Sequence, residues 1–287
     1  MTPETLSDKV ETIVSKAEQA LGKQVTKTQA ALFDQMSLLL NKLELNSEGL
    51  IIQNQANRKA LAQAETYFNK GMNQSGYYEA LNAIPNTIGE ITSANAAYFT
   101  TVLDSFSPDV QFIKSLQKQT ITQAENLLAN EGIELTLKQP ISNILNQNVN
   151  TSAAYNDLVK QLRTFITGSP EVDGALARYS KQIVTDTLFN YNRAYQEAIS
   201  ASSGLVWTKY VGGRMDTTRP FCVARVGKYF HKTEVEKWAS QDWAGKRAGT
   251  TRSTIFIYAG GYNCAHTIVY VHPDTVPDSV KDRVKKD

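Results

Sequence analysis

The chain has 287 residues, of which 41% are hydrophobic and 20% are charged, so it can bury a real core and wholesale disorder is excluded. Its net charge of +2 excludes a globally basic nucleic-acid coat, although it leaves room for a local basic patch. Two cysteines are too few for a disulfide framework. No apolar run reaches the roughly 20 residues of a membrane helix, and the start shows no signal peptide, so we expect synthesis in a cytosol and no membrane partner.

The first two hundred residues have the pattern of helices. Leu6, Val10 and Ile13 are spaced four and three apart, which is the spacing of one helix face, and Thr2-Pro3 is typical of an N-cap followed by the first helical residue. Residues 1–150 are therefore predicted to form a helical arm, either a coiled coil or ordinary bundle helices. We expect a short strand or extended link at 133–137.

The residues from 151 to 203 are predicted to be helices that lead into a different kind of domain. One of these helices is expected to begin at Ser169-Pro170-Glu171 and to run to about Ser200. All the tryptophans, cysteines and histidines, and half of the glycines, lie after residue 203. This change in composition predicts a domain boundary near Ser200–Gly204.

The remaining residues are predicted to form a small α+β domain at 204–275 and a charged tail at 276–287. The runs at 205–211, 255–258 and 267–271 are rich in β-branched and aromatic residues and are predicted strands. A short helix is expected at 232–239, with Thr233 as its cap. The fold class is thus α+β: an elongated, mainly helical N-terminal region followed by a small C-terminal α+β domain.

A candidate metal site lies in this last domain. Cys264 and His266 are two residues apart, so on an extended segment both side chains point to the same face. With Cys222, and with His231 or a water as the fourth ligand, they predict a zinc site; no other cofactor is expected. A small glycine-rich domain would gain stability from such a staple. Two alternatives stay open: a disulfide between the two cysteines, and simple packing of two buried thiols beside a core histidine.

Asp216 and Arg219, beside Pro220, have the spacing of a structural turn. Asp216 is expected to accept backbone N–H groups and Arg219 to pair with it or with a neighbouring carboxylate, while Asn263 fixes the turn before Cys264. The catalytic alternative would use Asp216 or Glu234 as a general base beside a metal. Three histidines and one Asp–Arg turn provide little acid–base machinery, so we expect no enzyme.

The segment 205–257 is locally basic. It has ten basic residues against four acidic ones, interleaved with aromatic residues. Such a patch could contact DNA phosphates, or it could be a solvated face. The candidate DNA contacts are Arg214, Arg225, Lys228, Lys246, Arg247 and Arg252.

Several short motifs follow one another between residues 150 and 272. They are the helix at 181–200, Gly204-Leu205-Val206-Trp207, Asp216-x-x-Arg219-Pro220-x-Cys222, Gly227-Lys228 and Asn263-Cys264-x-His266. This order resembles the MuF-type minor head proteins of tailed bacteriophages, also called phage head morphogenesis proteins. Ala265 stands where that family usually has Arg, and the helical arm lies outside the shared region.

The resemblance implies a minor structural protein of a phage head that acts in head assembly, genome packaging or delivery. It implies several copies in the virion, in the capsid interior or at the portal vertex, after synthesis in the host cytoplasm. The implied partners are the portal protein and the major capsid protein, and packaged double-stranded DNA is a further candidate. The alternatives are a metal-dependent nuclease or toxin-like module, and a DNA-binding module that uses the basic patch.

Overall fold

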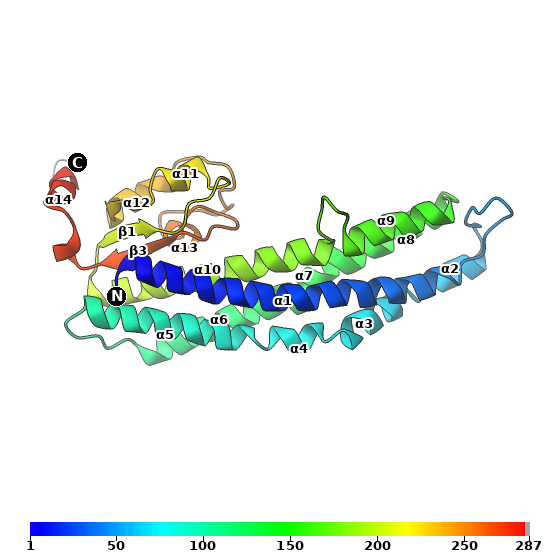
Figure 1. Ribbon diagram of the computed structural model, residues 1–287, viewed down its shortest axis with the longest axis horizontal. Coiled ribbons are helices and arrows are strands. Elements are labelled where there is room, and N and C mark those ends of the chain that lie inside the picture. Colours follow the sequence, from blue (N-terminus) through cyan, green and yellow to red (C-terminus); the bar gives the residue numbers. More distant parts are fainter. Residues whose placement is uncertain (285–287) are drawn as a thin grey trace. The chain divides into compact units, whose positions relative to one another are not determined.

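The computed structural model describes residues 1–284, and it has an α+β fold in which long helices precede a small antiparallel sheet (Figure 1). The predicted fold class is confirmed. The helices before the sheet are α1 (Pro3–Leu40), α2 (Gln55–Leu61), α3 (Ala64–Gln74), α4 (Tyr77–Leu81), α5 (Ile84–Val102), α6 (Val110–Ala129), α7 (Glu131–Ile133), the π-helix η1 (Glu134–Lys138), α8 (Gln139–Asn150), α9 (Tyr155–Thr167) and α10 (Ala175–Ser203). Among residues 1–284, no helix combines the length and apolar character needed to span a membrane.

The C-terminal module follows α10 and contains the three strands of the described residues. Its elements are β1 (Trp207–Val211), α11 (Pro220–Val223), β2 (Tyr229–His231), α12 (Lys232–Trp238), α13 (Ile255–Tyr258), β3 (Thr267–Val271), the 3-10 helix η2 (Pro273–Thr275) and α14 (Asp278–Val284). Residues 285–287 of the predicted charged tail lie outside the described residues.

The chain divides into two compact units that interleave along the sequence. One unit comprises Met1–Ala17, Ile84–Thr122 and Val184–Asp287, and the other comprises Glu18–Ala83 and Gln123–Ile183. The predicted consecutive ranges describe the order of elements along the chain, whereas the units describe how those elements pack.

The apolar stripe at the start of α1 behaves as predicted. Leu6, Val10 and Ile13 are buried, and Thr2 caps the helix by accepting the backbone N–H of Thr5 at 3.2 Å through its hydroxyl. Pro3 is the first helical residue, where its missing N–H costs nothing.

Two of the three predicted strands are confirmed, because the runs at 205–211 and 267–271 contain β1 and β3. The sheet order is β2-β1-β3, and Trp207 pairs with His231 on one side and with Val271 on the other. The three-residue strand β2 is too short to give a clear alternating signal in the sequence.

The predicted strand at 255–258 is wrong, because these residues form the helical turn α13. The hydroxyl of Thr254 accepts the N–H of Thr251 at 2.7 Å, and the carbonyl of Thr254 accepts the N–H of Tyr258 at 2.9 Å. A short apolar run fits a buried helical turn as well as a strand, so these local threonine bonds decide the conformation.

The predicted extended link at 133–137 is also wrong, because it forms the end of α7 and most of η1. Ile133 and Leu137 are four apart and both buried, whereas Leu135 between them is 54% exposed. The burial therefore follows the helical period and not the alternation of a strand. The predicted helix start at Ser169 is wrong too: a turn joins Ser169 to Val172, and α10 begins at Ala175.

A chain of buried amides joins the sheet to the helices of its own unit. Asn95 of α5 donates to Asn192 of α10 at 2.7 Å and accepts from Gln196 of α10 at 2.6 Å. Asn192 donates to the Thr267 hydroxyl of β3 at 3.1 Å, and Gln196 accepts the N–H of Tyr270 of β3 at 3.1 Å. These bonds place β3 against α10 at a defined register.

We predict that Asn95→Leu destabilises the protein by about 1–3 kcal/mol. The substitution removes the hydrogen bonds that Asn95 makes with the buried side-chain oxygen of Asn192 and the buried side-chain NH₂ of Gln196. Asn86→Leu is the matched control, since Asn86 is exposed on the same helix and should change stability by less than about 0.5 kcal/mol. Urea unfolding followed by circular dichroism measures both. Equal stability of the two variants would contradict the role of the amide chain.

Candidate metal centre

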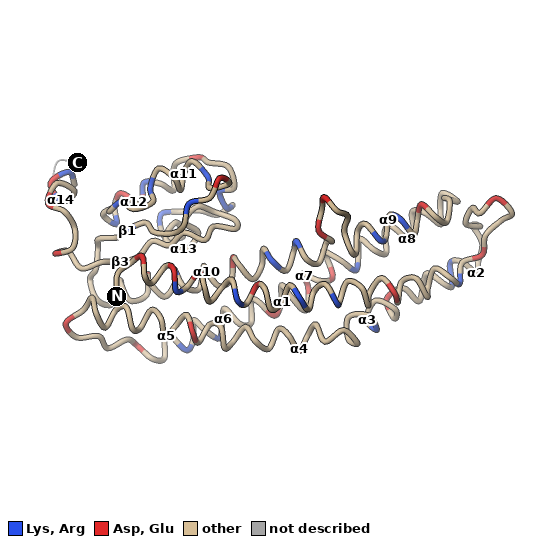
Figure 2. Tube along the Cα trace, viewed as in Figure 1, with Lys and Arg blue, Asp and Glu red and all other residues tan. Residues whose placement is uncertain are grey.

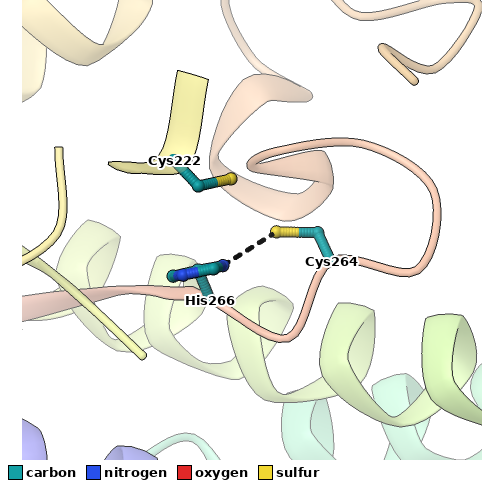
Figure 3. A group of neighbouring side chains, drawn as sticks. All are labelled: Cys222, Cys264 and His266. Atoms are coloured by element: carbon teal, nitrogen blue, oxygen red, sulfur yellow. Dashed lines mark hydrogen bonds between the residues drawn. The ribbon is translucent and has the colours of Figure 1, made fainter. Parts of the chain in front are cut away.

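Cys222, Cys264 and His266 converge in the C-terminal module, as the sequence predicts they could. One ligand atom from each lies within 4.8 Å of the others, and all three side chains are buried. Figure 3 shows the two sulfurs and the imidazole pointing toward one another from α11, from the loop after α13 and from the residue before β3. Both thiols are free.

Local turns bring the two cysteines to this point. Pro220 occupies the first turn of α11, and the N–H of Cys222 bonds to the carbonyl of Arg219 at 2.9 Å. Asn263 adopts a left-handed conformation with φ of 54°, and its N–H bonds to a carboxylate oxygen of Asp186 on α10 at 2.8 Å. The other oxygen of Asp186 accepts from Arg247 at 2.6 Å, so one buried carboxylate holds two loops of the module.

Two glycines let the backbone approach the group closely. A Cβ atom on Gly260 would overlap the sulfur of Cys222 and lie 2.8 Å from the sulfur of Cys264. A Cβ atom on Gly212, whose φ is +142°, would lie 2.8 Å from Cδ2 of His266. The cluster is thus enclosed by backbone that has room for no side chain.

A buried arginine holds the segment that carries Cys264 and His266. Arg193 of α10 is 1% exposed, and its guanidinium donates to the carbonyl of His266 at 2.9 and 2.7 Å and to the carbonyl of Cys264. It also donates to the carbonyl of Ile257 and to the side-chain oxygen of Asn190, each at 3.1 Å. Arg193 therefore fixes two of the three candidate ligands through their backbone.

The two thiols have different acidities. The hydrogen bond with Cys222 lowers the pKa of the Cys264 thiol well below its ordinary value, and the bond with His266 and the charge of Arg193 lower it further. The same contact with Cys264, together with burial, raises the pKa of Cys222. Cys264 is therefore the thiol of the pair that more readily becomes a thiolate, which is the form that binds a metal.

One nitrogen of the His266 imidazole faces the sulfur of Cys264. Nδ1 of His266 lies 3.7 Å from Sγ of Cys264, while Nε2 has no hydrogen-bond partner among the described residues. Two thiolates and an imidazole at this separation are donors that a divalent cation accepts, so the cluster could bind a metal ion.

His231 is not part of this group. Its Nδ1 accepts the N–H of Thr233 at 3.4 Å as the N-cap of α12, a position that we had expected Thr233 to fill. The ring also lies edge-on to Trp207, with 5.1 Å between the ring centroids. The backbone N–H of His231 bonds to Glu234 at 2.8 Å, and Glu234 also pairs with Arg283 at 2.9 Å. His231 and Glu234 thus form a capping box at the start of α12, which the sequence pattern did not reveal.

The turn at Asp216 is closed by other atoms than predicted. The hydroxyl of Thr218 accepts the N–H of Met215 at 2.8 Å, and Asp216 is exposed. Arg219, which was expected to pair with a carboxylate, instead donates to the carbonyl of Tyr262 at 2.6 Å. Arg219 thereby ties the start of α11 to the loop that carries Cys264.

Four of the six candidate DNA contacts form hydrogen bonds within the chain, three of them inside the module and one to α10. Arg214 donates to the carbonyls of Val223 and Val226, Arg225 to Phe221 and Gln241, Lys246 to Ala239 and Gln241, and Arg247 to Asp186. The other two, Lys228 and Arg252, are exposed. Figure 2 shows acidic and basic residues interspersed along α12. Most of these cations therefore serve to close loops.

Comparison of the chain with family models, with curated proteins and with solved structures finds no match. The candidate site is therefore interpreted from its own geometry.

We predict that Gly260→Ala destabilises the protein by about 1–3 kcal/mol, because the added methyl group meets both sulfurs. Gly89→Ala on α5 is the matched control: nothing lies within 4 Å of its added Cβ, so the substitution should stabilise the helix by up to about 1 kcal/mol. Thermal unfolding measures both. A Gly260→Ala protein as stable as wild type would show that the sulfurs can move away from this backbone.

Proposed function

We propose that the chain is a minor structural protein of a tailed bacteriophage head, associated with the portal or the capsid interior. The observation that carries the proposal is that the motifs of the resemblance converge on one module. The helix at 181–200 contains Arg193, and Arg193 bonds to the carbonyls of Cys264 and His266 from the last motif. Trp207 begins the strand that pairs with β3.

The position of the acids supports a structural and not a hydrolytic role. A hydrolytic metal needs an open coordination position and a base beside it. No carboxylate belongs to the Cys–Cys–His group in the described part of the chain, and Glu234 is bonded at the start of α12. The DNA-binding alternative has less support, because four of its six candidate cations form hydrogen bonds within the chain.

We further propose that the metal is zinc and that it acts as a staple for the module. Zinc suits two thiolates and an imidazole, and it has no redox chemistry that would consume the thiols. The energy of binding a structural metal is also folding energy for the segment that holds it. Here the ion would join α11, the loop after α13 and the start of β3.

We predict that the purified protein contains one zinc per chain and that Cys264→Ser abolishes this stoichiometry and lowers Tm by more than about 5 °C. His231→Ala is the control, because His231 lies outside the group and the variant should keep its zinc. Metal analysis and thermal unfolding measure both effects. Chelation should increase hydrogen exchange in residues 205–272 and leave Glu18–Ala83 unchanged. Wild-type protein without bound metal would contradict the staple.

We predict that the protein is present in purified particles from a culture that produces phage carrying its gene. Mass spectrometry of gradient-purified heads should detect it together with the portal protein, in fewer copies than the major capsid protein. A deletion of the gene should reduce the yield of heads or of infectious particles. A protein found only in the free fraction of the lysate, with normal particle yield after deletion, would contradict the proposed role.

A further inference from the structure

We propose that the phenol oxygen of Tyr210 is the fourth ligand of the metal ion held by Cys222, Cys264 and His266. The inference rests on the metal binding proposed above and deepens it. It makes the site a closed one with four protein ligands, and it assigns to Tyr210 the position for which the sequence had suggested His231 or a water.

Three of the separations among the four donor atoms are close to those of a tetrahedral site. The Tyr210 oxygen lies 3.3 Å from the sulfur of Cys222 and 3.9 Å from that of Cys264, and the Cys264 sulfur lies 3.7 Å from Nδ1 of His266. Ligands at about 2.0–2.3 Å from a tetrahedral zinc are separated from each other by about 3.3–3.8 Å. The separations of 3.3 and 3.7 Å fall in this range and that of 3.9 Å lies just above it, so the phenol oxygen is near enough to the group to be a fourth ligand.

The polar neighbours of this phenol differ from those of Tyr98 and Tyr77, which are also buried. Tyr98 donates to the carbonyl of Tyr270 at 2.7 Å, and Tyr77 donates to the carbonyl of Leu128 at 3.0 Å. Tyr210 is also fully buried, yet the hydrogen-bond partners of its hydroxyl in the described residues are two thiol sulfurs. Sulfur is a weak acceptor, so hydrogen bonding alone compensates this buried hydroxyl poorly.

The surrounding structure holds Tyr210 in this place. It lies on the central strand β1, where its backbone bonds to Lys228 at 3.0 Å and to Gly227 at 2.8 Å. Its ring stacks on His266 with 5.5 Å between centroids, and it meets Trp238 edge-on at 5.9 Å. A ligand held this firmly pays little conformational entropy when the metal binds.

The charges also balance with a phenolate in the site. A divalent ion with two thiolates and one phenolate carries a net charge of −1. Arg193 supplies +1 beside it, and its hydrogen bonds to the described residues go to neutral oxygens. A buried charge needs compensation, and a three-ligand site with neutral water would leave the guanidinium uncompensated. On binding, the phenol proton and the protons that the two thiols carry pass to the buffer.

Cobalt titration of the full chain tests the assignment. We expect wild type to bind one Co²⁺ with tetrahedral d–d bands that thiocyanate does not change, because no coordination position is open. Tyr210→Phe should show altered d–d bands, a response to thiocyanate and zinc affinity weaker by about tenfold or more, as judged by competition with a chromophoric chelator. Tyr98→Phe is the matched control: it removes a buried hydroxyl of the same unit and should keep the wild-type spectrum.

A measurement on wild type alone covers the case in which Tyr210→Phe does not fold. Zn²⁺ has no d–d bands, so they cannot obscure the ultraviolet spectrum of the protein. If Tyr210 is a ligand, adding zinc should produce the difference band of one ionised tyrosine. Zinc or cobalt binding without that band, or a Tyr210→Phe spectrum identical to wild type, would overturn the tyrosine ligand and leave the zinc staple intact. A wild-type chain that binds neither metal would overturn both.

Discussion

The C-terminal module depends on the hydrogen bonds that the buried guanidinium of Arg193 donates to its backbone. It projects from the long helix α10 and bonds to three backbone carbonyls, at Ile257, Cys264 and His266. The carbonyls of Cys264 and His266 belong to a segment outside the helices and strands, which needs partners for its polar groups when it is buried, and that of Ile257 belongs to the short helix α13. One side chain with five donors in a fixed fork can satisfy several of them at once. The loop that carries two of the candidate ligands is thereby attached to a rigid helix.

Other cationic side chains of the module also serve as hydrogen-bond donors to polar groups of the chain. Arg219 and Lys246 donate to carbonyls of neighbouring loops, Arg225 donates to the carbonyl of Phe221 in α11, and Arg247 pairs with Asp186 of α10. A module with a three-stranded sheet and short helices has few backbone partners to offer its loops, so long cationic side chains supply them. The positive charge of the segment is therefore largely structural.

The buried group of Cys222, Cys264 and His266 would give such a module a second point of attachment with a metal ion bound. The cysteines and histidine come from α11, the loop after α13 and the start of β3, and Gly260 and Gly212 let the backbone enclose them. An ion in that position would stabilise segments that contribute little apolar surface of their own. Because Cys222, Cys264 and His266 are all buried, the group offers little access to a substrate, which is the arrangement expected of a structural metal site.

The sequence by itself determined the features that depend on neighbouring residues. The stripe beginning at Leu6 predicted a buried helix face, and the β-branched runs predicted β1 and β3, because local periodicity reports which side of an element is buried. Rare residue types also identified Cys222, Cys264 and His266 as candidates, yet they could not separate His231 from the group. Only the tertiary structure decided that, and only it revealed Arg193, Asp186 and Tyr210, because these residues act on loops more than 50 positions away in the chain or from the opposite side of the cluster. Convergence of distant segments leaves no periodic signal in a single sequence.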